Sequence, residues 1–236
     1  MKKKKNHIFG FMALIIAGYS YSLFAAEPIL ENTEWSNIYI TAAQDRNSPR
    51  FLLAGDSIAS GYYNGVSENF AKEANCVKYA TSKFVGNPDF LEELSILLKR
   101  FKFSVIHINN GLHGWGYTEK QYEESLPELL KLLKTHANGA KLIWCMTTPV
   151  RKRSDLSRFN EQKNNRVIER NRIAAEFMTR NGIVINDLYG LVRDHPEYYA
   201  DDGTHFNNEG KAAQAEEVAK VIKEQFSNKT KAGDGK

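Results

Sequence analysis

The fold class is decided by one short stretch, Phe51-Leu52-Leu53-Ala54-Gly55-Asp56-Ser57-Ile58. Its first four residues are apolar and predict a buried strand, which Gly55 closes. Ser57 then stands on the turn after this strand and opens a helix. We therefore expect its hydroxyl at the carboxyl edge of a sheet, beside a helix N-terminus that favours developing negative charge. A serine is also a common N-cap in this position, so the stretch alone does not identify a catalytic residue.

Apolar runs alternate with helical patterns along the rest of the chain. Strands are expected at residues 51–54, 76–80, 103–108, 141–146 and 183–185, and further helices at 88–100, 118–136, 160–180 and 208–226. This alternation predicts an α/β protein with a three-layer α/β/α flavodoxin-like fold. The sheet is expected to hold five parallel strands in the order 2-1-3-4-5, with functional groups outside the carboxyl ends of the strands.

The chain has 236 residues, of which 42% are hydrophobic and 25% charged. This composition is that of a globular protein, and it excludes disordered tails, collagen-like repeats and small disulfide-rich domains. The formal net charge is +4, but the four lysines at 2–5 account for all of it. The remainder of the chain gives no reason to expect nucleic acid as a partner.

Residues 1–26 have the pattern of a secretory signal peptide. Four lysines precede an apolar run, and Ala25 and Ala26 offer a cleavage site. A retained N-terminal anchor is the alternative, although the run is shorter than the ~20 residues of a typical span. The leader has no cysteine for lipid attachment. We therefore expect a protein exported to the periplasm or the outside of the cell, with no membrane contact after cleavage.

The remaining chain divides into an N-terminal extension at 27–49, one main domain at 50–227 and a disordered polar tail at 228–236. Export makes a disulfide between Cys76 and Cys145 chemically possible. Each cysteine nevertheless lies in an apolar segment predicted as a buried strand, and the predicted sheet separates the two strands. We expect both cysteines to be buried and unpaired.

A second polar motif precedes the last helix, in the stretch Asp201-Asp202-Gly203-Thr204-His205. The spacing of three between Asp202 and His205 lets the carboxylate accept from one imidazole nitrogen while the other faces away. That arrangement is the orienting and basic half of a catalytic triad. By itself, the stretch is more typical of a helix-start loop with a surface histidine.

Together, the Gly-Asp-Ser stretch and the Asp-x-x-His stretch resemble the SGNH (GDSL) hydrolase superfamily, over residues 51–226. The resemblance implies that Ser57 is the nucleophile, His205 the general base and Asp202 its orienting carboxylate. Asp201 competes for the last role, but its spacing from His205 does not match the family pattern. The family also implies an oxyanion hole formed by the Ser57 N–H, a glycine N–H matching Gly86 and an asparagine side chain.

The third oxyanion group departs from the family pattern, because the usual Gly-x-Asn-Asp is replaced by Asn109-Asn110-Gly111-Leu112-His113-Gly114. Aligning the glycines puts His113 at the asparagine position, where a neutral imidazole N–H can donate as an amide does. Aligning on asparagine instead selects Asn110. The first alternative is favoured, with Asn110 ordering the loop.

Three further residues are candidate substrate contacts. Trp115 and Tyr62 flank the catalytic stretches and could stack on a sugar ring, and Arg151 could contact an acidic substrate; packing roles are the alternative for each. No cofactor is expected, since neither metal-ligand spacing nor a nucleotide-binding glycine loop is present in the sequence.

These features predict an exported serine esterase that forms an acyl-enzyme. The resemblance implies a short-chain acyl group, acetyl above all, on a small molecule or a glycan. An O-acyltransferase on glycans could use the same triad, and a non-catalytic glycan-binding domain is the alternative from another functional class. The complete set of Ser57, Asp202 and His205 argues against the binding domain.

Overall fold

The structure is a computed structural model that describes residues 27–233. Its centre is a six-stranded sheet in the order β1-β3-β2-β4-β5-β8. The strands are β1 (Ser36–Ile40), β2 (Arg50–Gly55), β3 (Asn75–Thr81), β4 (Val105–Ile108), β5 (Lys141–Cys145) and β8 (Val184–Asn186). A separate hairpin follows β5 and consists of β6 (Arg151–Lys152) and β7 (Asp155–Phe159). The fold is α/β, as predicted.

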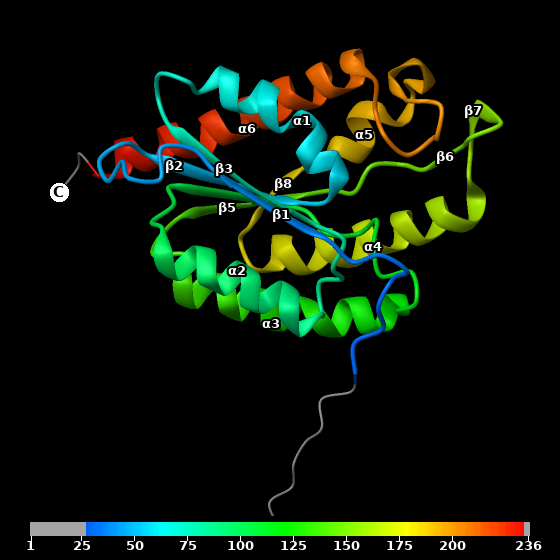
Figure 1. Cartoon of the computed structure of the whole chain (residues 1–236), viewed down its shortest axis with the longest axis horizontal. Coiled ribbons are helices and arrows are strands. Elements are labelled where there is room, and N and C mark those ends of the chain that lie inside the picture. The colour runs from blue at the N-terminus through cyan, green and yellow to red at the C-terminus, as the bar shows by residue number, and fades with distance from the viewer. Residues whose placement is uncertain (1–26, 234–236) are drawn as a thin grey trace, which may run out of the picture.

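Helices cover both faces of the sheet (Figure 1). One face carries α1 (Ser57–Asn69), α5 (Leu188–Arg193) and α6 (Asn208–Gly233), and the other carries α2 (Pro88–Arg100), α3 (Glu119–His136) and α4 (Glu161–Arg180). A short 3-10 helix, Pro196–Tyr198, lies between α5 and α6. Each face has its own apolar core, because strands buried on both sides point alternate side chains into the two layers.

The prediction of five strands is wrong in its count, because the N-terminal extension supplies a sixth. The five parallel strands follow one another as β3-β2-β4-β5-β8, and β1 pairs antiparallel with β3, with Ser36 opposite Thr81. Strand β1 is an edge strand whose residues are mostly exposed. An exposed edge strand does not need an alternating apolar pattern, so its sequence gave no period-two signal. The extension does pack on the domain.

Local sequence explains where the helices begin. Thr118 caps α3 with a full capping box, in which its hydroxyl accepts from Gln121 N–H and the Gln121 side chain accepts from Thr118 N–H. Asn87 and Asn160 cap α2 and α4 through their side-chain oxygens. Helix α6 runs to Gly233, into the segment predicted as a tail. The predicted signal peptide lies outside the described residues.

Cys76 on β3 and Cys145 on β5 are both buried and free, which confirms their predicted core position. Burial raises the pKa of the Cys76 thiol to about 11, so this thiol is protonated at neutral pH. Among the helices within residues 27–233, none has the length and apolar character that a membrane span requires. The hairpin of β6 and β7 was not predicted.

Candidate active site

Ser57 lies where the central strand β2 turns into α1. The preceding Asp56 is the N-cap of this helix, and its Oδ1 accepts a hydrogen bond from Ile58 N–H at 2.8 Å. The cap fixes the first helical turn, so the Ser57 hydroxyl has a defined position at the carboxyl edge of the sheet. Because Ser57 is the first residue of a 13-residue helix, the positive end of the helix dipole lies beside its hydroxyl.

His205 and Asp202 share a tight turn directly before α6. The Asp202 carboxylate accepts two backbone N–H bonds through Oδ1, from Thr204 at 2.9 Å and from His205 at 2.8 Å. Its other oxygen, Oδ2, lies 2.5 Å from His205 Nδ1. One carboxylate thus fixes both the backbone and the ring of His205.

Helix α6, which follows this turn, packs against α1, and His205 Nε2 lies 2.8 Å from Ser57 Oγ. Burial raises the pKa of the Asp202 carboxyl, but the hydrogen bonds from the His205 ring and from the two backbone N–H groups outweigh burial and hold this pKa below its ordinary value. Asp202 is therefore an anion near neutral pH. The structure brings Ser57, His205 and Asp202 together in the order hydroxyl, imidazole, carboxylate.

Asp56 adds a second carboxyl beneath the site. Its residue is only 3% exposed, and its Oδ2 has no hydrogen-bond partner within the described part of the chain. Burial raises the pKa of this carboxyl, and the electrostatic influence of His113 and His205 opposes the rise.

Gly86 and Asn110 lie in two loops that are joined by the Asn110 side chain. Its Oδ1 accepts from Val85 N–H at 3.1 Å, and its Nδ2 donates to the Lys83 carbonyl at 2.9 Å. The Asn110 carbonyl also accepts from the Tyr122 hydroxyl. Both polar ends of the Asn110 amide are thus used between the loop before α2 and the loop after β4. These bonds hold Gly86 at the carboxyl edge of the sheet.

His113 follows in the same loop and contacts the N-terminal extension. Its Nδ1 lies 2.8 Å from Glu31 Oε2, and the other oxygen of Glu31 accepts from Gly114 N–H at 2.7 Å. The Trp35 ring stands edge-on to the imidazole, with the ring centroids 6.1 Å apart. The extension therefore packs against the loop that carries His113.

Arg170 of α4 supports this loop from inside the protein. Its guanidinium is fully buried and donates to the carbonyls of Gly111 and His113 through one nitrogen and to that of Gly114 through another. Glu119 lies 3.4 Å from its Nε, and the rings of Trp115, Phe84 and Tyr122 surround the cation. Three carbonyls in one loop thus share one buried cation.

The structure buries two of the three predicted substrate contacts, Tyr62 and Arg151, and leaves Trp115 half-buried. Tyr62 is 2% exposed and lies in the core. Arg151 is 3% exposed, because it donates to the carbonyls of Leu156 and Arg193 and lies against the Phe159 and Tyr199 rings. Trp115 is half-buried, and the guanidinium groups of Arg166 and Arg170 lie over its ring. Tyr62 and Arg151 are therefore used in packing, and the substrate contact of Trp115 stays a prediction.

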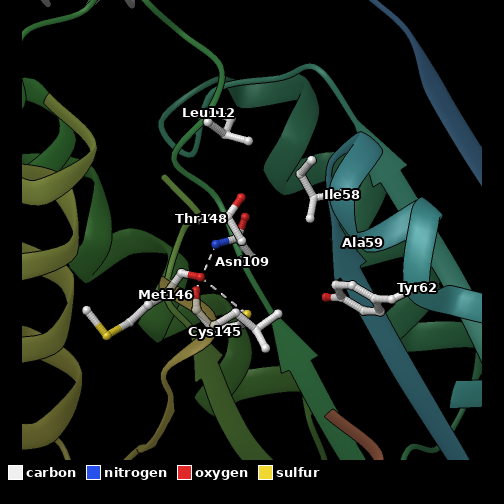
Figure 2. A pocket seen from close by; sticks show the side chains of 9 residues that line it. Ile58, Ala59, Tyr62, Asn109, Leu112, Cys145, Met146 and Thr148 are labelled. Carbon is white, nitrogen blue, oxygen red and sulfur yellow. Dashed lines mark hydrogen bonds between the residues drawn. The ribbon is translucent and has the colours of Figure 1, made fainter. Parts of the chain in front are cut away.

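A small cavity of about 10 Å³ lies beside the first turn of α1 (Figure 2). Ile58 and Tyr62 approach it from α1, and Leu112 and Thr148 line it from the loops after β4 and β5. This volume is close to that of one water molecule. The cavity therefore has space for little more than one water molecule.

Glu31 and Arg170 were not identified from the sequence. Position 170 did carry a signal, because it falls on the apolar face of α4 between Val167 and Ala174, where a charged residue is unusual. Glu31 lies in an extension without periodicity, so no sequence signal marked it. Within residues 27–233, no cluster of three or more His, Cys, Asp or Glu side chains is arranged to hold a metal ion.

Comparison with known proteins identifies the family of the chain. The sequence matches the GDSL-like lipase/acylhydrolase family over residues 53–213, more than half of the chain. The match includes Ser57, His113, Asp202 and His205. A comparison with curated protein sequences gives no match.

Several solved structures share the fold. An inhibitor-bound aryl esterase from M. smegmatis has a TM-score of 0.64 and 12% identity, and the alignment covers 75% of this chain and 100% of that one. A carbohydrate acetylesterase family member from Sinorhizobium meliloti has a TM-score of 0.61 and 13% identity, with 76% and 99% covered. A lipase/acylhydrolase from Enterococcus faecalis has a TM-score of 0.60 and 18% identity, with 75% and 96% covered.

Proposed function

Because the chain belongs to the GDSL-like lipase/acylhydrolase family and is an ester-hydrolysing enzyme of the SGNH/GDSL superfamily, we propose that Ser57, His205 and Asp202 are its catalytic triad. The observation that carries the proposal is the continuous contact from Ser57 Oγ to His205 Nε2 and from His205 Nδ1 to Asp202. A nucleophile, a base and an orienting carboxylate in this sequence are what acyl transfer requires.

The reaction has two steps. Ser57 Oγ attacks the ester carbonyl carbon while its proton passes to His205 Nε2; the tetrahedral intermediate then collapses, the ester C–O bond breaks, and His205 returns the proton to the leaving alcohol. A water molecule next attacks the acyl-enzyme, again losing its proton to His205, and the acid leaves as Ser57 regains its proton. Asp202 orients the imidazole and stabilises the imidazolium in both steps.

The oxyanion that forms in both steps needs donors outside the triad. We assign this role to the N–H groups of Ser57 and Gly86 and to the His113 ring. The helix dipole of α1 supports the first of these. Asn110 is the weaker alternative, since both ends of its amide are used within the loops. Asn110 instead orders the loop that carries His113.

For the substrate, we propose a short-chain acyl ester, acetyl in particular, on a small molecule or a glycan outside the cytoplasm. The leader-like pattern of residues 1–26 supports export. The fold shared with a carbohydrate acetylesterase family member from Sinorhizobium meliloti is consistent with an acetylated glycan. Transfer of the acyl group to a sugar hydroxyl would use the same acyl-enzyme.

The experiment is hydrolysis of p-nitrophenyl acetate by the protein lacking residues 1–26, measured beside Ser57→Ala. We expect turnover that depends on Ser57, with acetate as the product. Equal rates for the two proteins would contradict the proposal. Adding acetylated and free oligosaccharides then identifies the acceptor: acetate release indicates hydrolysis, and a newly acetylated sugar indicates transfer.

A further inference from the structure

Glu31 lies outside the domain that carries the triad, yet its carboxylate reaches a residue of the site. Its two oxygens contact adjacent residues, with Oε2 at 2.8 Å from His113 Nδ1 and Oε1 at 2.7 Å from Gly114 N. The side chains of Glu31 and His113 are only 26% and 21% exposed. This two-point contact fixes both the orientation of the imidazole and the backbone next to it.

The segment that presents Glu31 is itself anchored to the domain. Glu31 N–H donates to Glu34 Oε1 at 2.9 Å, and Glu34 Oε2 accepts from the Ser82 hydroxyl at 2.6 Å. Trp35 N–H donates to the same hydroxyl, and the Ile29 N–H donates to the Tyr117 hydroxyl. The carboxylate is therefore held in place from both sides of residue 31.

The loop that carries His113 borders the start of α1, where Ser57 lies. Leu112, the residue before it, lines the same small cavity as Ile58, the residue after Ser57 (Figure 2). The His113 ring also acts electrostatically on Asp56, which precedes Ser57. With Nδ1 taken by Glu31, Nε2 is the ring nitrogen left to contact a substrate.

We propose that Glu31 is a positioning residue of this site: its carboxylate holds the Nδ1 proton of His113 and directs Nε2 to the substrate. This inference rests on the proposed function, because it gives His113 a role in that reaction. A carboxylate only accepts, so the Nδ1 that faces it carries a proton.

The contact also specifies which form of His113 can stabilise an oxyanion. Neutral His113 with its proton on Nδ1 presents a lone pair at Nε2, and only the imidazolium presents an N–H there. The neutral Nε2–H donor expected from the sequence would place the Nδ1 lone pair against the Glu31 carboxylate. Donation from Nε2 beside the Glu31 carboxylate therefore requires protons on both ring nitrogens of His113.

The test uses Glu31→Gln, which keeps an oxygen for Gly114 N–H and replaces the carboxylate oxygen at His113 by an amide N–H. Glu27→Gln is the matched control, since Glu27 is an exposed carboxylate of the same segment. We expect kcat to fall about tenfold in Glu31→Gln with KM within about twofold, and the control to keep wild-type values.

A double-mutant cycle separates positioning from simple anchoring of the extension. In a His113→Gln background, Glu31→Gln should change kcat by less than about twofold, because the ring it positions is gone. An equal fall in both backgrounds would overturn the proposal, and so would wild-type turnover in Glu31→Gln.

Histidine ¹⁵N NMR reads the contact without any ester. The His113 signal is identified by its loss in His113→Gln. It should show a proton on Nδ1 in the wild type, whereas the neutral His113 ring of the Glu31→Gln variant should carry its proton on Nε2. The same Nδ1 proton in both proteins would overturn the assignment. An enzyme that lacks esterase activity but shows this NMR difference would contradict the proposed function alone.

Discussion

His205 Nε2 lies 2.8 Å from Ser57 Oγ, although 148 residues separate the two in the chain. The sheet topology explains the proximity. β2 is a central strand, so Ser57 at its carboxyl end lies in the middle of the sheet edge, and α6 packs beside α1 on the same face. The turn before α6 therefore lies directly over the start of α1.

Exchanging the orienting carboxylate should remove most of the turnover. In Asp202→Asn the amide can donate to His205 Nδ1 and so favour the wrong tautomer. We expect kcat to fall by about three to four orders of magnitude, measured with p-nitrophenyl acetate. Asp201→Asn is the matched control next to it and should keep at least half of the wild-type kcat. If the two variants exchanged these results, Asp201 would be the orienting residue.

Gly203 shapes the turn between Asp202 and His205. Its φ is +72°, and a Cβ there would lie 2.5 Å from the Arg151 carbonyl oxygen. Gly182 has the same φ of +72° with no atom within 4 Å of its Cβ position, so it isolates the backbone effect. Gly182→Ala should lose about 1–2 kcal/mol of unfolding free energy from the backbone strain alone. Gly203→Ala should lose more than Gly182→Ala, because the clash with Arg151 adds to the same strain.

Enzyme assays of these two glycine variants complete the comparison. Gly203→Ala should lose kcat because the turn that fixes His205 moves away from Arg151. Gly182→Ala should keep it, since Gly182 lies in the turn between α4 and β8. Equal stability and equal kcat in the two variants would contradict the steric argument.

His107 makes stability depend on pH. It is buried in β4, and burial lowers its pKa from 6.5 to about 3. Below pH 6.5 the unfolded chain binds a proton that the native protein does not, so this group lowers the unfolding free energy as pH falls. The contribution approaches about 1.4 kcal/mol per pH unit between pH 6 and pH 4.

Urea unfolding of the wild type and His107→Gln at several pH values measures this contribution. The variant should be less stable at pH 8 because it loses a packed ring, but its unfolding free energy should fall less steeply towards pH 4. If the unfolding free energies of the two proteins fell in parallel as pH decreases, His107 would take up its proton equally in the native and the unfolded state, which would contradict this prediction.

Arg170 should matter for stability more than any other arginine of α4. Lysine cannot donate to three carbonyls in one plane, so Arg170→Lys leaves the Gly111, His113 or Gly114 carbonyl without its partner. We expect a loss of about 2–4 kcal/mol in unfolding free energy. Arg172→Lys, an exposed change on the same helix, should cost less than about 0.5 kcal/mol. Similar losses of unfolding free energy in Arg170→Lys and Arg172→Lys would contradict the role of Arg170 as a buried donor to the three carbonyls.

The parts of the fold that could be predicted are those with periodic burial. Strands β2, β4 and β5 are apolar because helices cover both of their faces, and α2 and α3 carry leucine stripes with recognisable starts. Strand β1 could not be found, because an exposed edge strand imposes no such pattern. The hairpin of β6 and β7 is short and polar for the same reason.

The candidate site likewise contains residues that could be located from the sequence and residues that could not. Ser57, Asp202 and His205 could be located because their order within two short stretches follows the strand and helix boundaries. Glu31 could not, since its contact with His113 spans 82 residues and depends on how the extension crosses the domain. Arg151 and Tyr62 were misassigned because the sequence does not reveal whether a polar group bonds to a neighbouring carbonyl or faces solvent.

The most direct test of the central claim is covalent labelling of Ser57 with a fluorophosphonate, followed by peptide mass spectrometry. The reagent forms a tetrahedral adduct with an activated serine, whatever the natural ester is. We predict one adduct on Ser57 in the wild type, none in Ser57→Ala, and labelling slowed by orders of magnitude in His205→Gln. A folded wild-type protein without an adduct on Ser57, or with equal labelling in His205→Gln, would contradict the account.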